Sequence, residues 1–547
     1  MIQAFFSWEY GFENLVAPLA VVPIVVNVGA AVLPAILGGI MSAASILLRP
    51  RELLRAVRRR PWVPVLLAAL AAGAWWLTGW IIAAWPAGPD NVRGSTSIDW
   101  AQLATEAIYR EQVDSAPSPG GATQPAGGAV MLGRGPARCG YGQGPSPRNL
   151  LPLWRHRAHD TMYLSSPAVV GKWVYGASCY LDPPGNYGEI FCLDAETGGT
   201  RWMVDVATDP RTREKVELKG FFSSPAVTAD GQYVVIGQGL HYDRNCSLLC
   251  FEAATGKLYW RVPTPLHIES SPAVLGDLAV VGAGAVENEK MQAVGDPGFV
   301  LGVRISDGKV LWRQAVNDPE SSPALSADGI CYIGSGFNGS ELVALRTAGE
   351  AELQSRKLPR VLWRAKTPYP ATGAVTLWGK WVLIGCGNGD YVYADPNPAG
   401  AVLAFDRHTG KPAWQVQLPD AALGAVAAGP GRAIVPVRNG EIVAVDLARA
   451  GDRGADAILW RSRLSARAAV LAGVAYTGTH VYAVSKDGYL SVLRASDGKV
   501  VERHYVNDLN KPGEMGLSLS TPTVVGGRIY VGSETGGLLC LAGRKAS

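Results

Sequence analysis

Two long apolar runs dominate the first 85 residues. The first extends from residue 15 to residue 48 and the second from residue 62 to residue 85, and neither contains a charged side chain. A helix needs about 20 apolar residues to cross a bilayer, so we predict two transmembrane helices, at about residues 24–47 and 62–85. Pro18, Pro23 and Pro34 interrupt the first run, which therefore accommodates one span rather than two.

A basic loop, residues 48–61, separates the two predicted spans. Its six arginines face a single acid, Glu52, and are Arg49, Arg51, Arg55, Arg58, Arg59 and Arg60. Basic loops remain in the cytoplasm, so we expect everything after Trp85 to lie on the periplasmic side of the inner membrane. A cleaved signal peptide is the alternative, but the first 14 residues contain Glu9 and Glu13 and no Lys or Arg. Residues 1–85 are therefore interpreted as a membrane anchor.

Residues 86–128 differ in composition from the anchor. They contain a stretch rich in Pro and Gly, from Pro117 to Gly128. Such composition is typical of flexible connections. We expect this segment to be a linker that tethers a large domain, residues 129–543, to the membrane.

A repeated pattern of short strands fills the rest of the chain. The motif Ser-Ser-Pro-Ala begins at Ser165, Ser223, Ser270 and Ser321, and a weaker copy begins at Ser520. Each copy precedes a β-like run, a turn and then a tryptophan, and these tryptophans are Trp154, Trp202, Trp260, Trp312, Trp363, Trp414 and Trp460. A period near 50 residues with four short strands per unit predicts a β-propeller.

The repeat count predicts eight four-stranded antiparallel blades in an all-β domain. We expect blades to start near Ser165, Ser223, Ser270, Ser321, Ala371, Ala422, Ala466 and Ser520. The last blade lacks room for a fourth strand, so the segment from Leu153 to Arg157 should supply it and close the ring. Glu502 occupies the position where an eighth tryptophan is expected, which predicts a weaker junction at that blade.

The charge balance argues against nucleic acid as a partner. Lys and Arg total 50 against 46 Asp and Glu, a net charge of +4, and the arginine loop carries that excess. The propeller is therefore close to neutral, which does not favour nucleic-acid binding.

The repeat, with the outline Asp-x-x-Thr-Gly-x-x-x-Trp, resembles the pyrroloquinoline-quinone-like (PQQ-like) propeller repeat over about residues 129–543. The segment from Met131 to Trp154 is similar to the start of such propellers. The resemblance implies that each repeat tryptophan docks between neighbouring blades. It also implies one of two functions: a quinoprotein dehydrogenase with quinone and Ca²⁺ on the propeller axis, or a non-catalytic propeller such as the one in the outer-membrane β-barrel assembly machinery.

The chain resembles the non-catalytic kind more closely. The enzymes of the family carry two adjacent cysteines beside the quinone, and this sequence contains no adjacent Cys pair and no Cys-x-x-Cys-His haem site. We therefore expect no catalytic residues and no cofactor. The alternative is a PQQ- and calcium-dependent membrane dehydrogenase of alcohols or sugars, because membrane-bound quinoprotein glucose dehydrogenase also has spans before its propeller.

Few polar residues stand out as candidates for a site. Glu269 and Glu320 each precede a Ser-Ser-Pro motif, so both could line one mouth of the axial channel and bind a cation or substrate. The seven histidines show no zinc spacing. Cys192, Cys250 and Cys540 share one repeat position, which other blades fill with Gly or Ala, so we interpret them as packing residues. No metal site is predicted.

Long loops suggest where partners bind. Loops joining the second and third strands share a face with those joining consecutive blades, and the long ones on that face are 179–188, 204–222, 284–298, 386–400 and 503–519. Long loops on a rigid scaffold tend to carry binding. We expect a scaffold that binds envelope or membrane proteins through this face, with a polysaccharide-binding module as a further possibility.

Overall fold

The computed structural model describes the propeller and not the N-terminal region. The described residues are 130–157, 161–182, 185–240, 243–286, 292–392, 394–465, 468–510, 513 and 517–543. The predicted spans, the arginine loop and the linker all lie outside these residues, so they stay predictions. Every helix within the described ranges is too short or too polar to cross a bilayer.

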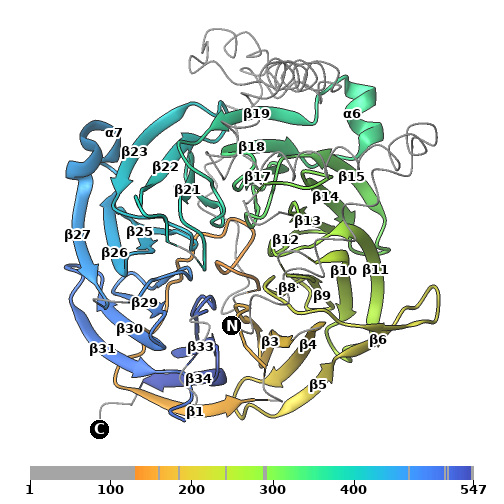
Figure 1. Cartoon of the computed structure of the whole chain (residues 1–547), viewed down its shortest axis with the longest axis horizontal. Helices are drawn as coiled ribbons and strands as arrows, with labels where there is room; N and C mark the ends of the chain where they lie inside the picture. Colours follow the sequence, from red (N-terminus) through yellow and green to blue (C-terminus); the bar gives the residue numbers. More distant parts are fainter. Residues whose placement is uncertain are drawn as a thin grey trace, which may run out of the picture. The chain divides into compact units, whose positions relative to one another are not determined.

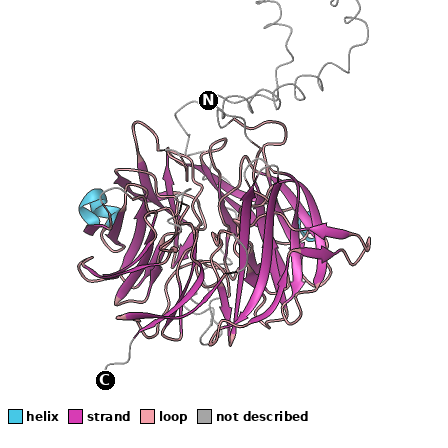
Figure 2. Cartoon of the chain, turned by 60° about the horizontal axis from the view of Figure 1, so that its bottom comes forward, coloured by secondary structure: helices cyan, strands magenta, loops and turns pink. Residues whose placement is uncertain are grey.

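The predicted propeller is confirmed. Eight four-stranded antiparallel sheets, built from the described residues, surround a central axis (Figure 1). The strands run through the thickness of the disc, and loops cover both ends (Figure 2). Each blade begins with a short strand near the axis and ends with its fourth strand at the rim.

The first four blades follow one another along the chain. Blade one contains β2 (Ala168–Val170), β3 (Trp173–Asp182), β4 (Gly185–Asp194) and β5 (Thr200–Val204). Blade two contains β8 (Ala226–Val227), β9 (Tyr233–Gly237), β10 (Arg244–Glu252) and β11 (Leu258–Leu266). Blade three contains β12 (Ala273–Leu275), β13 (Leu278–Ala283), β14 (Phe299–Arg304) and β15 (Val310–Ala315). Blade four contains β16 (Ala324–Leu325), β17 (Ile330–Gly334), β18 (Glu341–Arg346) and β19 (Val361–Lys366).

The next three blades repeat this order. Blade five contains β20 (Thr376–Trp378), β21 (Trp381–Gly387), β22 (Gly400–Asp406) and β23 (Pro412–Leu418). Blade six contains β24 (Ala427–Gly429), β25 (Arg432–Val437), β26 (Glu441–Asp446) and β27 (Ile458–Arg463). Blade seven contains β28 (Ala475–Tyr476), β29 (His480–Ser485), β30 (Tyr489–Arg494) and β31 (Val500–Tyr505).

A few elements lie outside the blades. The hairpin of β6 (Val206–Thr208) and β7 (Lys215–Glu217) follows blade one and projects beyond the ring beside β5 (Figure 1). Helix α6 (Glu350–Arg356) lies between the last two strands of blade four, and α7 (Ala450–Arg453) with η3 (Gly454–Ala457) lies between those of blade six.

Blade eight combines the two ends of the propeller, as predicted. It contains β32 (Thr523–Val525), β33 (Arg528–Ser533) and β34 (Gly537–Gly543), and its outer strand is β1 (Leu150–His156). Strand β1 pairs antiparallel with β34, from Leu150 opposite Gly543 to His156 opposite Leu538. The strand is longer than the predicted segment because it begins three residues earlier. The pairing removes the free sheet edge that an open ring would expose.

Glu502 has a role in this closure that the repeat pattern did not predict. Its two carboxylate oxygens accept hydrogen bonds from the backbone N–H groups of Asn149 and Leu150, at 2.7 and 2.6 Å. The residue that replaces the eighth tryptophan therefore fixes the beginning of β1 against blade seven.

The repeat tryptophans connect each blade to the next. Six indole N–H groups donate to a carbonyl of the following blade at 2.6 to 3.1 Å: Trp154 to Ala195, Trp202 to Ala253, Trp260 to Ile305, Trp312 to Thr347, Trp363 to Arg407 and Trp460 to Ala495. The indole nitrogen of Trp414 is buried without a hydrogen-bond partner. It faces blade six, where α7 and η3 replace the usual tight turn.

The glycine of the Thr-Gly turn is required by this docking. A Cβ atom at Gly256 would lie 2.6 Å from the ring of Trp202, and Gly256 has a φ of +73°. Gly198 and Gly410 of the same turn, and Gly308 and Gly498 of the Asp-Gly turns that replace it, face the tryptophan of the preceding blade in the same way. Any larger residue would both strain the backbone and displace the indole, which explains why Gly and Trp recur together.

The Ser-Ser-Pro motif forms a second set of links, close to the axis. The first serine donates to the backbone of the next blade, as Ser223 does to Ser270 at 3.0 Å. The second serine accepts from the preceding blade, as Ser271 does from the N–H of Ser224 at 2.9 Å.

Blades five, six and seven have Gly and Ala at these positions. The strand registers place their starts at Gly373, Gly424 and Ala472, two to six residues beyond the predicted ones.

The segment before β1 closes one end of the axis. Residues 130–149 cross the centre of the ring (Figure 1), and their carbonyls accept backbone hydrogen bonds from the inner strands of five blades: Val227 to Val130, Leu325 to Pro136, Leu377 to Ala137, Ala428 to Cys139 and Tyr476 to Gly140. Arg138 is fully buried and donates to the carbonyls of Leu132, Ser271, Pro272 and Pro323. Burial lowers the pKa of Arg138 to about 9, so it stays charged at neutral pH.

The loop predictions need two corrections. Residues 179–188 are not a loop, because β3 and β4 continue as a hairpin that extends to Asp182 and Gly185. Residues 204–222 contain the β6–β7 hairpin rather than irregular chain. Both errors have the same cause: the tips of these hairpins carry turn-forming residues, such as Asp182 and Gly185 in one and Asp209 and Pro210 in the other, which resemble loop sequence.

The inter-blade tryptophans should carry much of the stability. Trp202→Ala removes a buried ring that packs against Tyr175 and leaves the carbonyl of Ala253 without its indole donor. We expect a loss of about 3–5 kcal/mol in the free energy of unfolding, measured by denaturant titration. Trp381→Ala is the control, because Trp381 is only half-buried. Equal losses in both variants would contradict the docking role.

Candidate functional site

Eight equivalent residues surround the axis, one from each blade. Each lies four positions before the first paired residue of its inner strand, and all eight line one cavity: Leu164, Phe222, Glu269, Glu320, Thr372, Leu423, Leu471 and Leu519. We call this set the axial ring. Five of its members are apolar, and the two carboxylates and the threonine come from the consecutive blades three, four and five.

The cavity inside the axial ring is small. It has a volume of about 100 Å³, and Leu132 of the segment that closes the axis lines it as well. Tyr391, from the loop between β21 and β22, also lines it. The structure thus places both predicted axial residues, Glu269 and Glu320, in the cavity.

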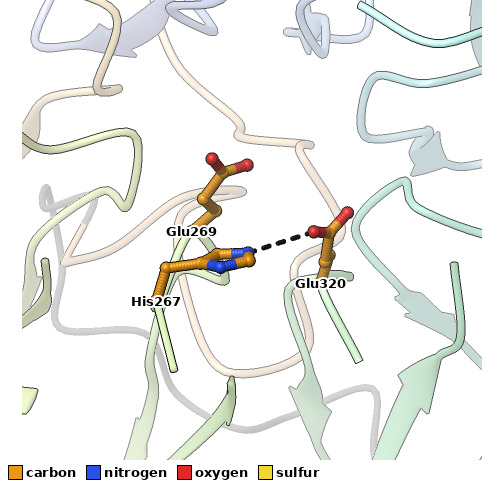
Figure 3. A group of neighbouring side chains, drawn as sticks. All are labelled: His267, Glu269 and Glu320. Atoms are coloured by element: carbon orange, nitrogen blue, oxygen red, sulfur yellow. Dashed lines mark hydrogen bonds and ion pairs between the residues drawn. The ribbon is translucent and has the colours of Figure 1, made fainter. Parts of the chain in front are cut away.

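A buried histidine that the sequence analysis did not single out lies beside the two carboxylates of the cavity. His267 is fully buried, and its Nε2 lies 3.1 Å from Oε1 of Glu320 (Figure 3). One ligand atom each from His267, Glu269 and Glu320 lie within 4.8 Å of one another. His267 and Glu269 are two residues apart in the connection between β11 and β12, and both belong to this group. That spacing was the signal available in the sequence.

Gly284 makes this arrangement possible. It is the first residue after β13, and its N–H donates to the carbonyl of His267 at 3.2 Å. A Cβ atom at this position would lie 2.7 Å from both His267 Nε2 and Glu320 Cγ. The cluster therefore lies next to the first residue of the predicted loop 284–298. Only glycine at this position allows the backbone to approach the cluster so closely.

The carboxylates influence the groups around them. Burial, together with the charges of Glu320 and Glu269, raises the pKa of Tyr391 above its usual range, so its hydroxyl stays protonated. The pKa of the Cys179 thiol is also raised, mainly by burial and to a smaller extent by the charge of Glu269. The cavity is thus a site where negative charge is concentrated in a largely apolar setting.

The eight cysteines take no part in disulfide bonds. All are free thiols, and every one except Cys139 is buried. Burial raises the pKa of Cys192, Cys246, Cys386 and Cys540 to about 12. Three of the eight cysteines, Cys192, Cys250 and Cys540, lie opposite the repeat tryptophan of the neighbouring strand in their blades. In other blades the same position is occupied by Gly302, Ala344, Ala404 and Ala444. The small side chain leaves room for the indole.

The cavity does not fit the quinone and calcium that the family resemblance raises. Small-molecule sites usually have volumes of roughly 300 Å³ or more, about three times the volume available here. Calcium prefers an all-oxygen ligand set, whereas this cluster includes an imidazole nitrogen. The axial residues thus match a single small ion better than a three-ring cofactor with calcium.

The other predicted residues lie away from this cluster. Trp154, Trp202, Trp260, Trp312, Trp363, Trp414 and Trp460 are in the outer strands of seven blades. The arginines of the predicted topology loop lie outside the described residues.

Comparison with known proteins identifies the repeat. A family model described as outer membrane protein assembly factor BamB matches residues 186–360 and 349–547, which confirms the resemblance to the PQQ-like propeller family. No curated protein matches the chain.

Solved structures share the fold at low sequence identity. BamB from Moraxella catarrhalis is 16% identical with a TM-score of 0.51, and the alignment covers 72% of this chain and 99% of that one. A europium-containing methanol dehydrogenase is 14% identical with a TM-score of 0.53, covering 76% and 98%. The quinohemoprotein alcohol dehydrogenase from Comamonas testosteroni is 14% identical with a TM-score of 0.52, covering 77% and 81%. At such identities these similarities establish the fold alone.

Proposed function

The chain belongs to the family described as outer membrane protein assembly factor BamB, and on that premise we propose that it is a non-catalytic, membrane-anchored propeller that binds protein partners in the cell envelope. The anchor is the predicted pair of spans at about residues 24–47 and 62–85. The family relationship favours a binding role, and the properties of one surface groove support it.

The groove lies beside blade one and has a volume of about 370 Å³. Tyr180 and Tyr187 from the β3–β4 hairpin and Val206 from β6 line it, and their exposed fractions are 36%, 48% and 42%. Exposed apolar groups that gather in one hollow are typical of interaction sites, and tyrosine is enriched at protein interfaces. This groove is the observation that carries the proposal.

The charge of the groove indicates the chemistry of the partner. Glu189, Asp205 and Glu217 line it together with the tyrosines, and the described lining includes no Lys or Arg. Opposite charges across an interface guide association and select the partner. A protein segment that combines basic and apolar side chains would complement this surface.

The groove is held in shape before any partner binds. The N–H of Leu218 donates to the carbonyl of Asp205 at 2.8 Å, and the N–H of Gly188 donates to the carbonyl of Leu218 at 3.0 Å. Ala207, Leu218 and Phe221 pack into the core shared by blades one and two. These contacts fix the β6–β7 hairpin, so little conformational entropy is lost at this surface on binding.

A quinone-dependent dehydrogenase is the second candidate, because methanol and alcohol dehydrogenases share the propeller. The small axial cavity and its ligand set do not favour it. Adding PQQ with Ca²⁺ to the purified protein and measuring alcohol- or sugar-dependent dye reduction distinguishes the two functions. Turnover would replace the binding proposal, and we expect none.

Removing the groove tyrosines should weaken partner capture. We expect Tyr180→Ser with Tyr187→Ser to reduce recovery of crosslinked envelope proteins from intact membranes by about tenfold, because aromatic residues dominate interface energetics. Recovery is measured by quantitative mass spectrometry. The control, Leu459→Ser with Val501→Ser, removes two similarly exposed apolar side chains from the rim of blades six and seven. Equal recovery from both double variants would exclude the groove as the binding surface.

The proposed location can be tested separately. We propose that the propeller lies in the periplasm and that the loop at residues 48–61 lies in the cytoplasm, following the positive-inside rule. Alkaline phosphatase, which is active only outside the cytoplasm, should be active when fused after residue 547 and inactive when fused after residue 55. The reverse pattern would place the propeller in the cytoplasm.

A further inference from the structure

We infer that Glu269 and Glu320 of the axial ring, together with the buried His267, bind one divalent transition-metal ion of the class of Zn²⁺. The ligands are Nε2 of the histidine and one carboxylate oxygen of each glutamate. This inference does not depend on the proposed function, because the axial cavity shares no lining residue with the groove of blade one.

The donor set selects the class of metal. Imidazole nitrogen suits zinc, copper, nickel and iron, whereas carboxylate oxygen is shared by these ions and by calcium and magnesium. One nitrogen with two carboxylates resembles the three-ligand sites in which zinc retains an open position for water. The fully buried His267 therefore excludes a simple calcium-type site.

One of the ligand separations is already the one that an ion would require. Zinc lies about 2.0–2.2 Å from nitrogen and oxygen ligands, so neighbouring ligands round one ion are roughly 3–3.5 Å apart. The separation of His267 Nε2 and Glu320 Oε1 is 3.1 Å. All three ligand atoms lie within 4.8 Å of one another, and Glu269 faces the cavity. The Glu269 oxygen therefore has to move closer to the other two ligands when the ion binds.

The two glutamates are positioned by the propeller framework. Each directly precedes a Ser-Ser pair, and these pairs are linked across blades three and four. Ser270 Oγ donates to the carbonyl of Ser321 at 2.9 Å, and the N–H of Ser271 donates to Ser322 Oγ at 2.9 Å. The backbone separation of the two ligands is therefore fixed before a metal arrives. Such support from hydrogen bonds around the ligands raises metal affinity.

The remainder of the axial ring strengthens the attraction. Leu164, Phe222, Leu423, Leu471 and Leu519 occupy the equivalent positions on five blades. An apolar surrounding lowers the local dielectric and increases the interaction between a cation and two carboxylates. The cavity of about 100 Å³ has room for an ion and its water.

Metal binding can be measured directly on the full-length, untagged protein in detergent after dialysis against a chelator. We expect Zn²⁺ to bind at one equivalent by calorimetry and to raise the unfolding temperature, because the ion binds only the folded state. We expect Co²⁺ in place of zinc to give visible absorption bands of a nitrogen- and oxygen-ligated ion. Ca²⁺ at the same concentration should produce neither effect.

Variants of the ligands identify the site. Glu269→Gln and Glu320→Gln should each weaken Zn²⁺ binding at least tenfold, and His267→Gln should abolish the cobalt bands. Glu214→Gln and His408→Gln are the matched controls, since both residues are exposed. His267 is buried, so its variant is interpreted only if its circular dichroism equals that of the parent. The two Glu variants test the site independently of it.

Two outcomes would overturn the inference. Stoichiometric Zn²⁺ binding that both Glu variants retain would place the metal elsewhere. Binding of Ca²⁺ but not of Zn²⁺ would make the axial ring a hard-cation site. Neither result bears on partner capture, so failure here leaves the proposed function to its own test.

Discussion

Closure of the ring by β1 is the interaction on which the rest of the structure depends. A four-stranded sheet cannot bury both of its faces alone, and a row of such sheets leaves an edge at each end. The pairing of β1 with β34 joins the two ends of the propeller, and Glu502 fixes the start of β1 against blade seven. Because the chain enters β1 from residues 130–149, the same closure holds the segment that covers one end of the axis.

The closed ring provides a rigid frame in which single positions vary. Seven blades contribute a tryptophan to the rim and the remaining one contributes Glu502, while all eight contribute a residue of the axial ring to the centre. Leu164 and Glu269 occupy equivalent positions, yet one supplies apolar surface and the other a carboxylate. Chemistry can therefore differ between blades three and four and the others without any change in the fold.

Much of this architecture could be predicted because it repeats. The Ser-Ser-Pro motif and the tryptophans predicted the number of blades, and the unpaired last blade predicted the closing strand. Glu269 and Glu320 were identified as axial because each precedes a recognisable motif. The starts of blades five to seven were misplaced because Gly373, Gly424 and Ala472 replace the serines there, so the motif gives no local signal.

The features that could not be predicted occur once in the chain. His267 lies between a strand and a motif, and only the structure shows that blade four brings Glu320 to it. Arg138 is a charged residue in a Gly-rich segment, which would normally indicate an exposed loop, but it is completely buried and donates to four backbone carbonyls. The β6–β7 hairpin and its groove are an insertion, so no repeat rule describes them.

Hydrogen exchange of the full-length protein tests the central claim most directly. If β1 closes the ring, peptides that cover residues 150–156 will exchange as slowly as those from β33 and β34, because their amides open only when blade eight unfolds. Exchange of residues 150–156 within seconds, while β33 and β34 remain protected, would show that the ring is open at this point and would contradict the account.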